Sequence, residues 1–392
     1  MKDAYIVAAA RTPVGKAHRG CLSKTRPDDM LAHVIGETVS RTGDIETGRI
    51  DDAIIGCAMP EGTQGMNIAR IGVLLAGLPD TVPGVTVNRF CSSGLQTIAM
   101  AADRIRLGEA DLILAGGTES MTTVPMMGHK PEFNPDMFTS EHINIAYGMG
   151  ITAENVASQY QISRQAQDEF AYNSHQQAMA AISSNIDTGI SPIMTRSYQA
   201  DGSTVKVLER MFEVDEGPRP DTSVEALSRL RTVFKADGSV TAGNSSQMSD
   251  GAAALMLASE DAVKEYDLKP LAVFRGFSVA GVAPEIMGIG PIAAIPKVLK
   301  QTGIKLAELD WIELNEAFAA QALAVIGDVG LDPEKVNPLG GAISLGHPLG
   351  ATGAILSTKM IHAMRERQLK YGMVTMCIGT GMGAAGIFEI LN

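Results

Sequence analysis

The sequence contains little cysteine, and what it has is widely spaced. Only four of the 392 residues are cysteine (Cys21, Cys57, Cys91 and Cys377), and no two of them form a CxxC pair. This spacing excludes a disulfide-rich framework and provides no zinc or other metal site. Free thiols are typical of a reducing compartment, so we expect a cytoplasmic protein.

An excess of positive charge and long hydrophobic runs are also missing. The chain has 32 Lys and Arg against 44 Asp and Glu, a formal charge of −12, and its basic residues are scattered. This pattern argues against a nucleic-acid footprint. No apolar run approaches the roughly 20 residues that span a bilayer. The N-terminal apolar run is interrupted by Arg11 and Pro13, so we expect no signal peptide.

Short apolar runs alternate with helix-length segments, and the order of these elements repeats in the two halves of the chain. The runs lie at 4–10, 51–57 and 111–117, with a short apolar lead-in to the 87–94 stretch, and then at 271–277, 309–315 and 372–379. Alternation of this kind predicts an α/β fold, and the repeated order indicates an internal duplication. We expect two duplicated α/β core halves with mixed, mostly parallel sheets.

The stretch between the halves has a different texture, with Met-, Asn- and Pro-bearing loops and a helical stretch near 151–185. It is interpreted as an inserted loop domain that covers the site. The predicted division is an N-terminal core half of residues 1–118 with 249–270, an inserted domain of 119–248, and a C-terminal core half of 271–392.

Cys91 stands in VNRFCSSG, where a predicted strand ends and a helix begins. Leu95, Ile98, Ala102 and Ile105 fall on one face of that helix, which places the thiol at its amino end. Unpaired backbone N–H groups and the helix dipole are expected to lower the pKa of the Cys91 thiol. Most lone cysteines, however, are small buried apolar residues, and Cys91 alone fits that alternative equally well.

Two further turns in the second half combine glycine with a reactive side chain. His347 lies in GGAISLGHPLGATG directly before Pro348, a residue favoured at the start of helices, so we expect a neutral imidazole at a helix amino end. Cys377 ends an apolar run and is followed by Gly379, Thr380 and Gly381. Each motif is weak by itself, but equivalent positions in a duplicated chain predict one shared cleft.

The motifs together resemble the thiolase family over nearly the whole chain. They are ARTPVGK (10–16), VNRFCSSG (87–94), GGTESM (116–121), MGITAEN (149–155), TAGNSSQMSDGAAA (241–254), NEAFAAQA (315–322), GHPLGATGA (346–354) and CIGTGMG (377–383). The resemblance implies a thiolase-like fold and cleavage of 3-ketoacyl-CoA by CoA to acetyl-CoA and a shortened acyl-CoA. It implies no permanently bound cofactor, since CoA is a co-substrate.

The resemblance also implies roles for single residues. Cys91 matches the nucleophile that carries the acyl group, His347 the residue that activates it, and Cys377 the second, acid/base cysteine. Asn315 matches a residue that holds a water beside the developing enolate, although it could instead cap the helix that follows. The backbone N–H groups of Cys91 and Gly379 match the second set of oxyanion donors.

For CoA itself, the resemblance implies four contacts. Arg219 matches a position at the nucleotide end, Ser246 a pantetheine hydrogen-bonding residue, and Met149 and Phe318 the walls of the pantetheine channel. Arg219 could equally be an ordinary solvated charge.

One departure bears on the substrate. Thiolases specific for acetoacetyl-CoA typically carry a histidine where this chain has Gly148, which favours a degradative 3-ketoacyl-CoA thiolase of fatty-acid β-oxidation. The alternatives are a biosynthetic-type acetoacetyl-CoA thiolase and a non-catalytic CoA or lipid binder. The family also implies a homodimer or homotetramer, which can assemble with a hydratase/dehydrogenase subunit.

Overall fold

The computed structural model describes residues 2–392, so of the predicted division only Met1 lies outside the described part. Its main sheet has the strand order β10-β11-β12-β9-β1-β8-β5-β3-β4, with β2 paired to β8. The strands of this sheet are β1 (Tyr5–Arg11), β2 (Gly15–Lys16), β3 (Asp52–Gly56), β4 (Val85–Val87), β5 (Leu112–Ser120), β8 (Ser249–Ala258), β9 (Ala272–Gly281), β10 (Trp311–Leu314), β11 (Tyr371–Ile378) and β12 (Met382–Ile390).

Eleven α-helices accompany the sheet in the described chain. They are α1 (Pro27–Thr42), α2 (Ile68–Leu75), α3 (Ser93–Leu107), α4 (Met149–Gln159), α5 (Arg164–Ser184), α6 (Val224–Ser228), α7 (Glu260–Glu265), α8 (Gly290–Thr302), α9 (Ala319–Val329), α10 (Ala342–Leu345) and α11 (Thr352–Glu366).

The expected duplication is visible in the strand order. From the middle of the sheet outward, the first half contains β1, β8, β5 and β3, and the second half contains β9, β12, β11 and β10. In the first half β1 pairs with β8, and β8 pairs with β5. In the second half β9 pairs with β12, and β12 pairs with β11 in the same way. The halves meet where β1 pairs with β9 through Tyr5 and Ile6.

The expectation of mostly parallel sheets was wrong. Only β3/β4, β3/β5 and β10/β11 pair in parallel, whereas the other six pairs are antiparallel. One physical reason is a short connection. Only residues 379–381 separate β11 from β12, too few for the crossover that a parallel neighbour needs.

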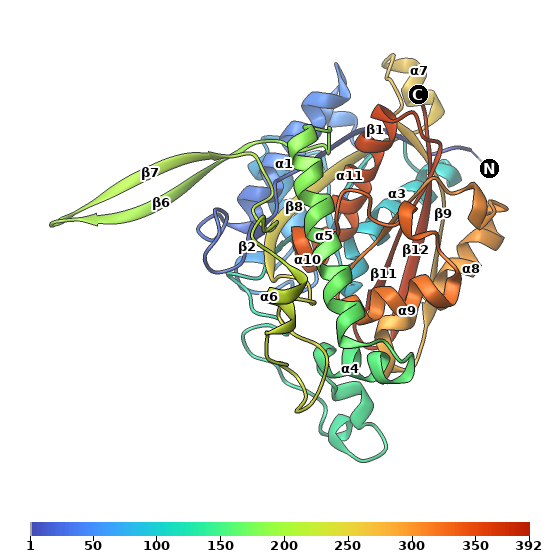
Figure 1. Cartoon of the computed structure of the whole chain (residues 1–392). Helices are drawn as coiled ribbons and strands as arrows, with labels where there is room; N and C mark the ends of the chain where they lie inside the picture. Colours follow the sequence, from blue (N-terminus) through green and yellow to red (C-terminus); the bar gives the residue numbers. More distant parts are fainter. Residues whose placement is uncertain (1) are drawn as a thin grey trace.

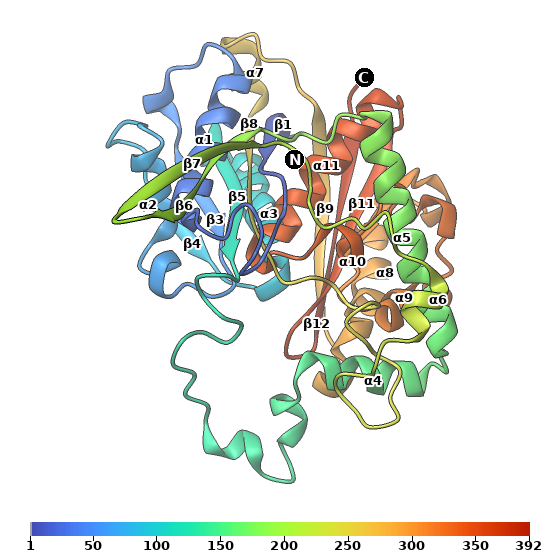
Figure 2. The same cartoon turned by 60° about the vertical axis from the view of Figure 1, so that its left-hand side comes forward.

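Both halves of the sheet pack on the same two helices (Figure 2). Leu95 and Ile98 of α3 and Ile355 and Met360 of α11 share one buried cluster with apolar side chains from β3, β5, β8, β9, β11 and β12. The outer face of the first half is covered by α1 and α2, and that of the second half by α8 and α9. The helices that follow Cys91 and His347 therefore lie in the central layer.

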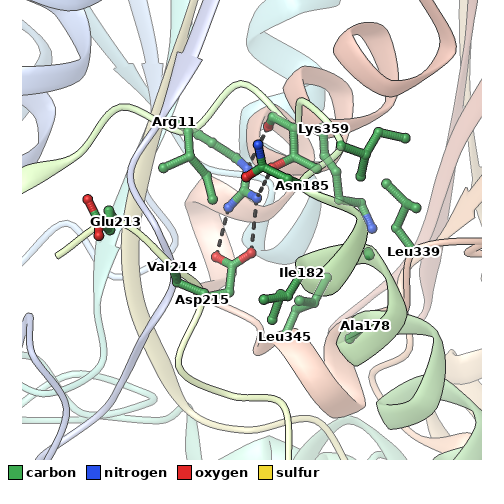
Figure 3. Close-up of a pocket in the computed structure, with 14 residues that line it drawn as sticks. Arg11, Ala178, Ile182, Asn185, Glu213, Val214, Asp215, Leu339, Leu345 and Lys359 are labelled. Carbon is green, nitrogen blue, oxygen red and sulfur yellow. Dashed lines mark hydrogen bonds and ion pairs between the residues drawn. The ribbon is translucent and has the colours of Figure 1, made fainter. Parts of the chain in front are cut away.

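The stretch between β5 and β8 contains α4, α5, α6 and a two-stranded hairpin of β6 (Ile193–Asp201) and β7 (Thr204–Phe212), which projects away from the body of the molecule (Figures 1 and 2). Its return segment is tied to the core by a buried ion pair. The Arg11 guanidinium donates to both Asp215 carboxylate oxygens at 2.8 and 3.0 Å, close to the pocket that Lys359 also lines (Figure 3). The proposed boundaries of the three parts stay a prediction. Within residues 2–392, no helix combines the length and the apolar character needed to cross a membrane.

Candidate active site

Cys91 occupies the joint that the sequence indicated. It lies in the 3-10 turn Phe90–Ser92 that leads directly into α3, and its side chain is buried. Phe90, just before it, has a φ of +44°, a conformation that is uncommon for residues other than glycine. The Asn88 side chain accepts the Phe90 N–H at 2.8 Å and so holds this turn from the strand side.

His347 lies between α10 and the short 3-10 turn Leu349–Ala351 that opens α11. The helical turn thus begins just after Pro348, one residue later than expected. The Thr352 hydroxyl donates to the Pro348 carbonyl at 3.1 Å, so its oxygen is left to accept from His347 Nδ1 at 2.6 Å. This arrangement leaves His347 Nε2 unprotonated and able to accept a proton.

Asn315 follows β10 and is buried beside the imidazole, with its Nδ2 3.4 Å from His347 Nε2. The alternative role as a helix cap was wrong, because α9 begins only at Ala319 and its N-cap residue is Phe318. Asn315 Oδ1 is buried and has no hydrogen-bond partner among the described residues. An unpaired buried acceptor is costly, so this oxygen is suited to hold a water or a substrate group.

Cys377 lies in β11, and the turn after it brings a backbone donor to the nucleophile. The backbone N–H groups of Gly379 and of Cys91 itself lower the pKa of the Cys91 thiol. The turn requires glycine at 381, where φ is +87° and an added Cβ would lie 2.3 Å from the Val282 carbonyl oxygen. Cys377 and Cys91 line the same cavity, and ionisation of Cys91 would raise the pKa of Cys377 further.

Close packing of glycine brings the two helix starts together. A Cβ added to Gly94 of α3 would lie 2.7 Å from the Ala354 nitrogen, and one added to Gly353 of α11 would lie 2.3 Å from the Leu95 nitrogen. Backbones can approach this closely only where side chains are absent. The glycines after Cys91 and His347 thus explain how turns 256 residues apart in the sequence reach one site.

Cys91, His347 and Cys377 line one cavity of about 810 Å³. Its wall beside Cys91 contains Ala17, Met121 and Leu349, which pack with the nucleophile in one cluster. Its wall beside Cys377 contains Met149, Met287 and Phe318. A mainly apolar cavity with a few reactive groups is typical of a site for a small organic substrate.

The protonation states differ in part from those expected. Burial lowers the pKa of His347 to about 4, so the imidazole is neutral as predicted, although burial rather than the helix end is the cause. Burial raises the pKa of Cys91 to about 11, and the Gly379 and Cys91 N–H groups offset it only in part. The expectation of a lowered pKa was therefore wrong, because desolvation of a buried thiol outweighs the helix end. Burial also raises the pKa of Cys377.

Three of the four predicted CoA contacts lie in this cavity, namely Ser246, Met149 and Phe318. Arg219 does not line it. Its side chain is 61% exposed and lies 3.7 Å from the Asp221 carboxylate, as in the alternative of a solvated charge.

The sequence reasoning missed two groups. Lys16, His18 and Arg19 line the cavity from strand β2 and the turn that follows it. Glu119 is 1% exposed and accepts hydrogen bonds from residues of both halves. A charged residue at the end of the otherwise apolar run in GGTESM was the signal that could have identified it.

Comparison with known proteins agrees with this geometry. Residues 4–261 match the family model described as "Thiolase, N-terminal domain", and residues 268–390 match "Thiolase, C-terminal domain". The chain belongs to the thiolase family. A 3-ketoacyl-CoA thiolase of Bacillus subtilis is 53% identical over 100% of both chains.

Solved thiolase structures have the same fold. Human mitochondrial 3-ketoacyl-CoA thiolase in complex with CoA superposes with a TM-score of 0.88 at 37% identity, over 100% of this chain and 98% of that one. The dimeric peroxisomal thiolase of Saccharomyces cerevisiae gives a TM-score of 0.89 at 41% identity, again over 100% and 98%. The thiolase-like α/β fold expected from the sequence is confirmed.

Proposed function

We propose that this chain is an acyltransferase that cleaves 3-ketoacyl-CoA with CoA, giving acetyl-CoA and an acyl-CoA shortened by two carbons. The observation that carries the proposal is the meeting of Cys91, His347 and Cys377 in one cavity. Membership of the thiolase family and the 53% identity to a 3-ketoacyl-CoA thiolase support the same reaction.

Cys91 is the nucleophile. Because its pKa is about 11, it is a thiol at neutral pH and must lose its proton as it attacks. His347 Nε2 accepts that proton, and Thr352 stabilises the imidazolium that forms by accepting from Nδ1. The Cys91 sulfur bonds to the 3-keto carbon, the bond to the adjacent carbon breaks, and the acyl group stays on Cys91 as a thioester.

Cys377 handles the second proton. The electron pair of the broken carbon–carbon bond leaves on the enolate of acetyl-CoA, and the Cys377 thiol protonates its carbon. The resulting thiolate then takes the proton of an incoming CoA, whose sulfur attacks the thioester. The shortened acyl-CoA is released, and Cys91 leaves as a thiol by taking back the proton that His347 holds. Because its pKa is raised, Cys377 is protonated at neutral pH and can therefore donate a proton before it accepts one.

Two sets of donors stabilise the negative oxygens. The N–H groups of Cys91 and Gly379 act on the Cys91 thiol, so we expect them to donate to an oxygen on the carbon that is bound to its sulfur. The enolate oxygen is stabilised by His347 and by a water bound to the unpaired Asn315 Oδ1.

CoA is the co-substrate, and we place its pantetheine arm between Met149, Phe318 and Ser246. The presence of CoA in the related human structure supports this use of the cavity. Arg219 is retained as the proposed nucleotide contact, now at the surface rather than in the cavity.

Gly148 supports the degradative subtype. It lines the cavity, and a Cβ built on it meets no atom within 4 Å, so the space that a histidine would fill is open. A thiolysis profile with 3-ketoacyl-CoAs of four to sixteen carbons tests the proposal. We expect activity well beyond the four-carbon substrate; activity confined to it would favour the acetoacetyl-CoA alternative, and no activity at all would favour a non-catalytic CoA binder.

We further propose a homodimer, alone or paired into a tetramer, in the cytoplasm. The main sheet ends at β4, where Val85 is 41% exposed, and Leu75 of the neighbouring α2 is 55% exposed. An exposed sheet edge with apolar neighbours is typical of a surface that a second chain covers, and the yeast relative is dimeric. Association with a hydratase/dehydrogenase subunit stays part of the proposal, and co-purification with such a subunit tests it.

A further inference from the structure

Glu119 is an unusual group to find beside this cavity. It lies near the end of β5, is 1% exposed, and forms no ion pair with any cation of the described chain. A buried carboxylate without a counter-cation is costly and requires several hydrogen bonds. Burial raises the pKa of Glu119, and the N–H groups that donate hydrogen bonds to it lower that pKa again in part.

Its hydrogen bonds join the two halves at the site. One oxygen accepts the Ala58 N–H at 2.7 Å and the Gly350 N–H at 2.8 Å. The other accepts the Met59 N–H at 3.3 Å and the Gln64 side-chain amide. Ala58 and Met59 follow β3 of the first half, whereas Gly350 belongs to the turn that begins with His347 and Pro348 in the second.

The Gly350 turn has no room to move independently of the first half. A Cβ added at Gly350 would lie 2.6 Å from the Ala58 nitrogen and 2.8 Å from the Glu119 carboxylate. The imidazole of His347 is fixed to this turn through Thr352. The position of His347 therefore depends on the carboxylate that binds Gly350.

The same carboxylate is connected to the Cys91 turn. The N–H of Ala58 donates to Glu119, and the carbonyl of the same residue accepts a hydrogen bond from the Asn88 side chain at 3.0 Å. Asn88 in turn accepts the N–H of Phe90, the residue before Cys91. Both catalytic turns are thus held by hydrogen bonds that converge on one side chain outside the cavity lining.

We propose that Glu119 is a positioning residue that sets the Cys91 sulfur and the His347 imidazole at reacting distance. The inference rests on the proposed function for its kinetic consequence. Its charge provides an independent readout, since Glu119 also raises the pKa of Cys91, together with burial. The other titratable group beside Glu119 is Cys57, at 3.8 Å. Those in the cavity that Cys91 lines are His347, Cys377, Lys16, His18 and Arg19.

The test uses Glu119→Gln and Glu119→Asp in the full chain. Glu119→Gln places an amide NH₂ where backbone donors need an acceptor, so we expect kcat to fall about a hundredfold, the size of effect that a 1 Å misplacement produces. KM for both substrates should be unchanged, because Glu119 does not line the cavity. The midpoint of Cys91 alkylation by iodoacetamide should move to lower pH. Glu119→Asp keeps the negative charge but has a shorter side chain. Its kcat should therefore fall, while the pH midpoint of Cys91 alkylation should be unchanged.

Glu154→Gln is the matched control. Glu154 is also buried and accepts backbone N–H groups, from Ser239 at 2.9 Å and Val240 at 2.9 Å, in α4. The Glu154→Gln substitution should lower the free energy of unfolding without changing the pH midpoint of Cys91 alkylation. A Glu119→Gln protein with kcat within twofold of the wild type, or with an unchanged midpoint, would overturn the proposal. The alkylation measurement needs no turnover, so an inactive wild type would contradict the proposed function and still leave Glu119 testable.

Discussion

The close contact between the starts of α3 and α11 gives a prediction about Gly353. An alanine there would place its Cβ 2.3 Å from the Leu95 backbone nitrogen, whereas ordinary contacts begin near 3.4 Å. The two backbones must therefore separate by roughly 1 Å, since van der Waals contacts require it. Because α3 carries Cys91 and α11 follows His347, the strain acts directly on the catalytic pair.

Two magnitudes follow. Overpacking at a buried position typically costs about 1–3 kcal/mol, so Gly353→Ala should lower the free energy of unfolding by that amount. A separation of about 1 Å between catalytic groups can reduce the rate about a hundredfold, so kcat should fall on that scale. KM should change little, because Gly353 does not line the cavity.

The matched control is Gly36→Ala in α1. A Cβ built on Gly36 meets no atom within 4 Å, so the substitution should only improve helix propensity, by about 0.5–1 kcal/mol. Urea unfolding and steady-state thiolysis, measured on both variants and the wild type, provide the comparison. The reasoning would be refuted if Gly353→Ala were as stable as Gly36→Ala and retained full kcat.

Three further outcomes are expected. First, the alkylation rate of Cys91 in the unliganded protein should rise continuously with pH toward about 11, the pKa set by burial; a plateau near neutral pH would instead reveal a thiolate–imidazolium pair with His347. Second, Asn315→Ala should reduce kcat about a hundredfold, as loss of an oxyanion donor does, without lowering the free energy of unfolding in urea, because it also removes the unpaired buried oxygen; a large loss of stability would contradict this. Third, the folded pKa of His347, about 4, lies below its ordinary 6.5, so the unfolded chain binds the extra proton between these values and stability falls with acidity. From pH 7 to pH 4.5, urea unfolding should show the wild type losing roughly 2–3 kcal/mol more than His347→Asn, and parallel losses in the two proteins would disprove the assignment.

The sequence predicted the features that depend on local pattern. The repeated order of apolar runs predicted the duplicated halves, and small residues around Cys91, His347 and Cys377 predicted their meeting at one site. These predictions succeeded because the ends of strands and the starts of helices are determined largely by nearby residues.

The failures depend on what surrounds a residue in three dimensions. β8 and β12 are antiparallel because each is the last strand of its half and returns between two earlier strands. The residues of one segment alone do not indicate this pairing. The pKa of Cys91 depends on complete burial by residues from distant segments, and burial outweighed the helix end that the local sequence indicated. Glu119 was missed because its donors come from residues 57–64 and from Gly350, both far from it in the sequence.

The central claim is that Cys91 carries the acyl group during turnover. Intact-mass spectrometry after incubation with acetyl-CoA, followed by peptide mapping, tests it directly. We expect one acetyl group per chain, located on Cys91 and removed when free CoA is added, and no acetylation of Cys91→Ala. An unmodified wild-type chain, or an acetyl group located on Cys377 or Cys57 instead, would contradict the account.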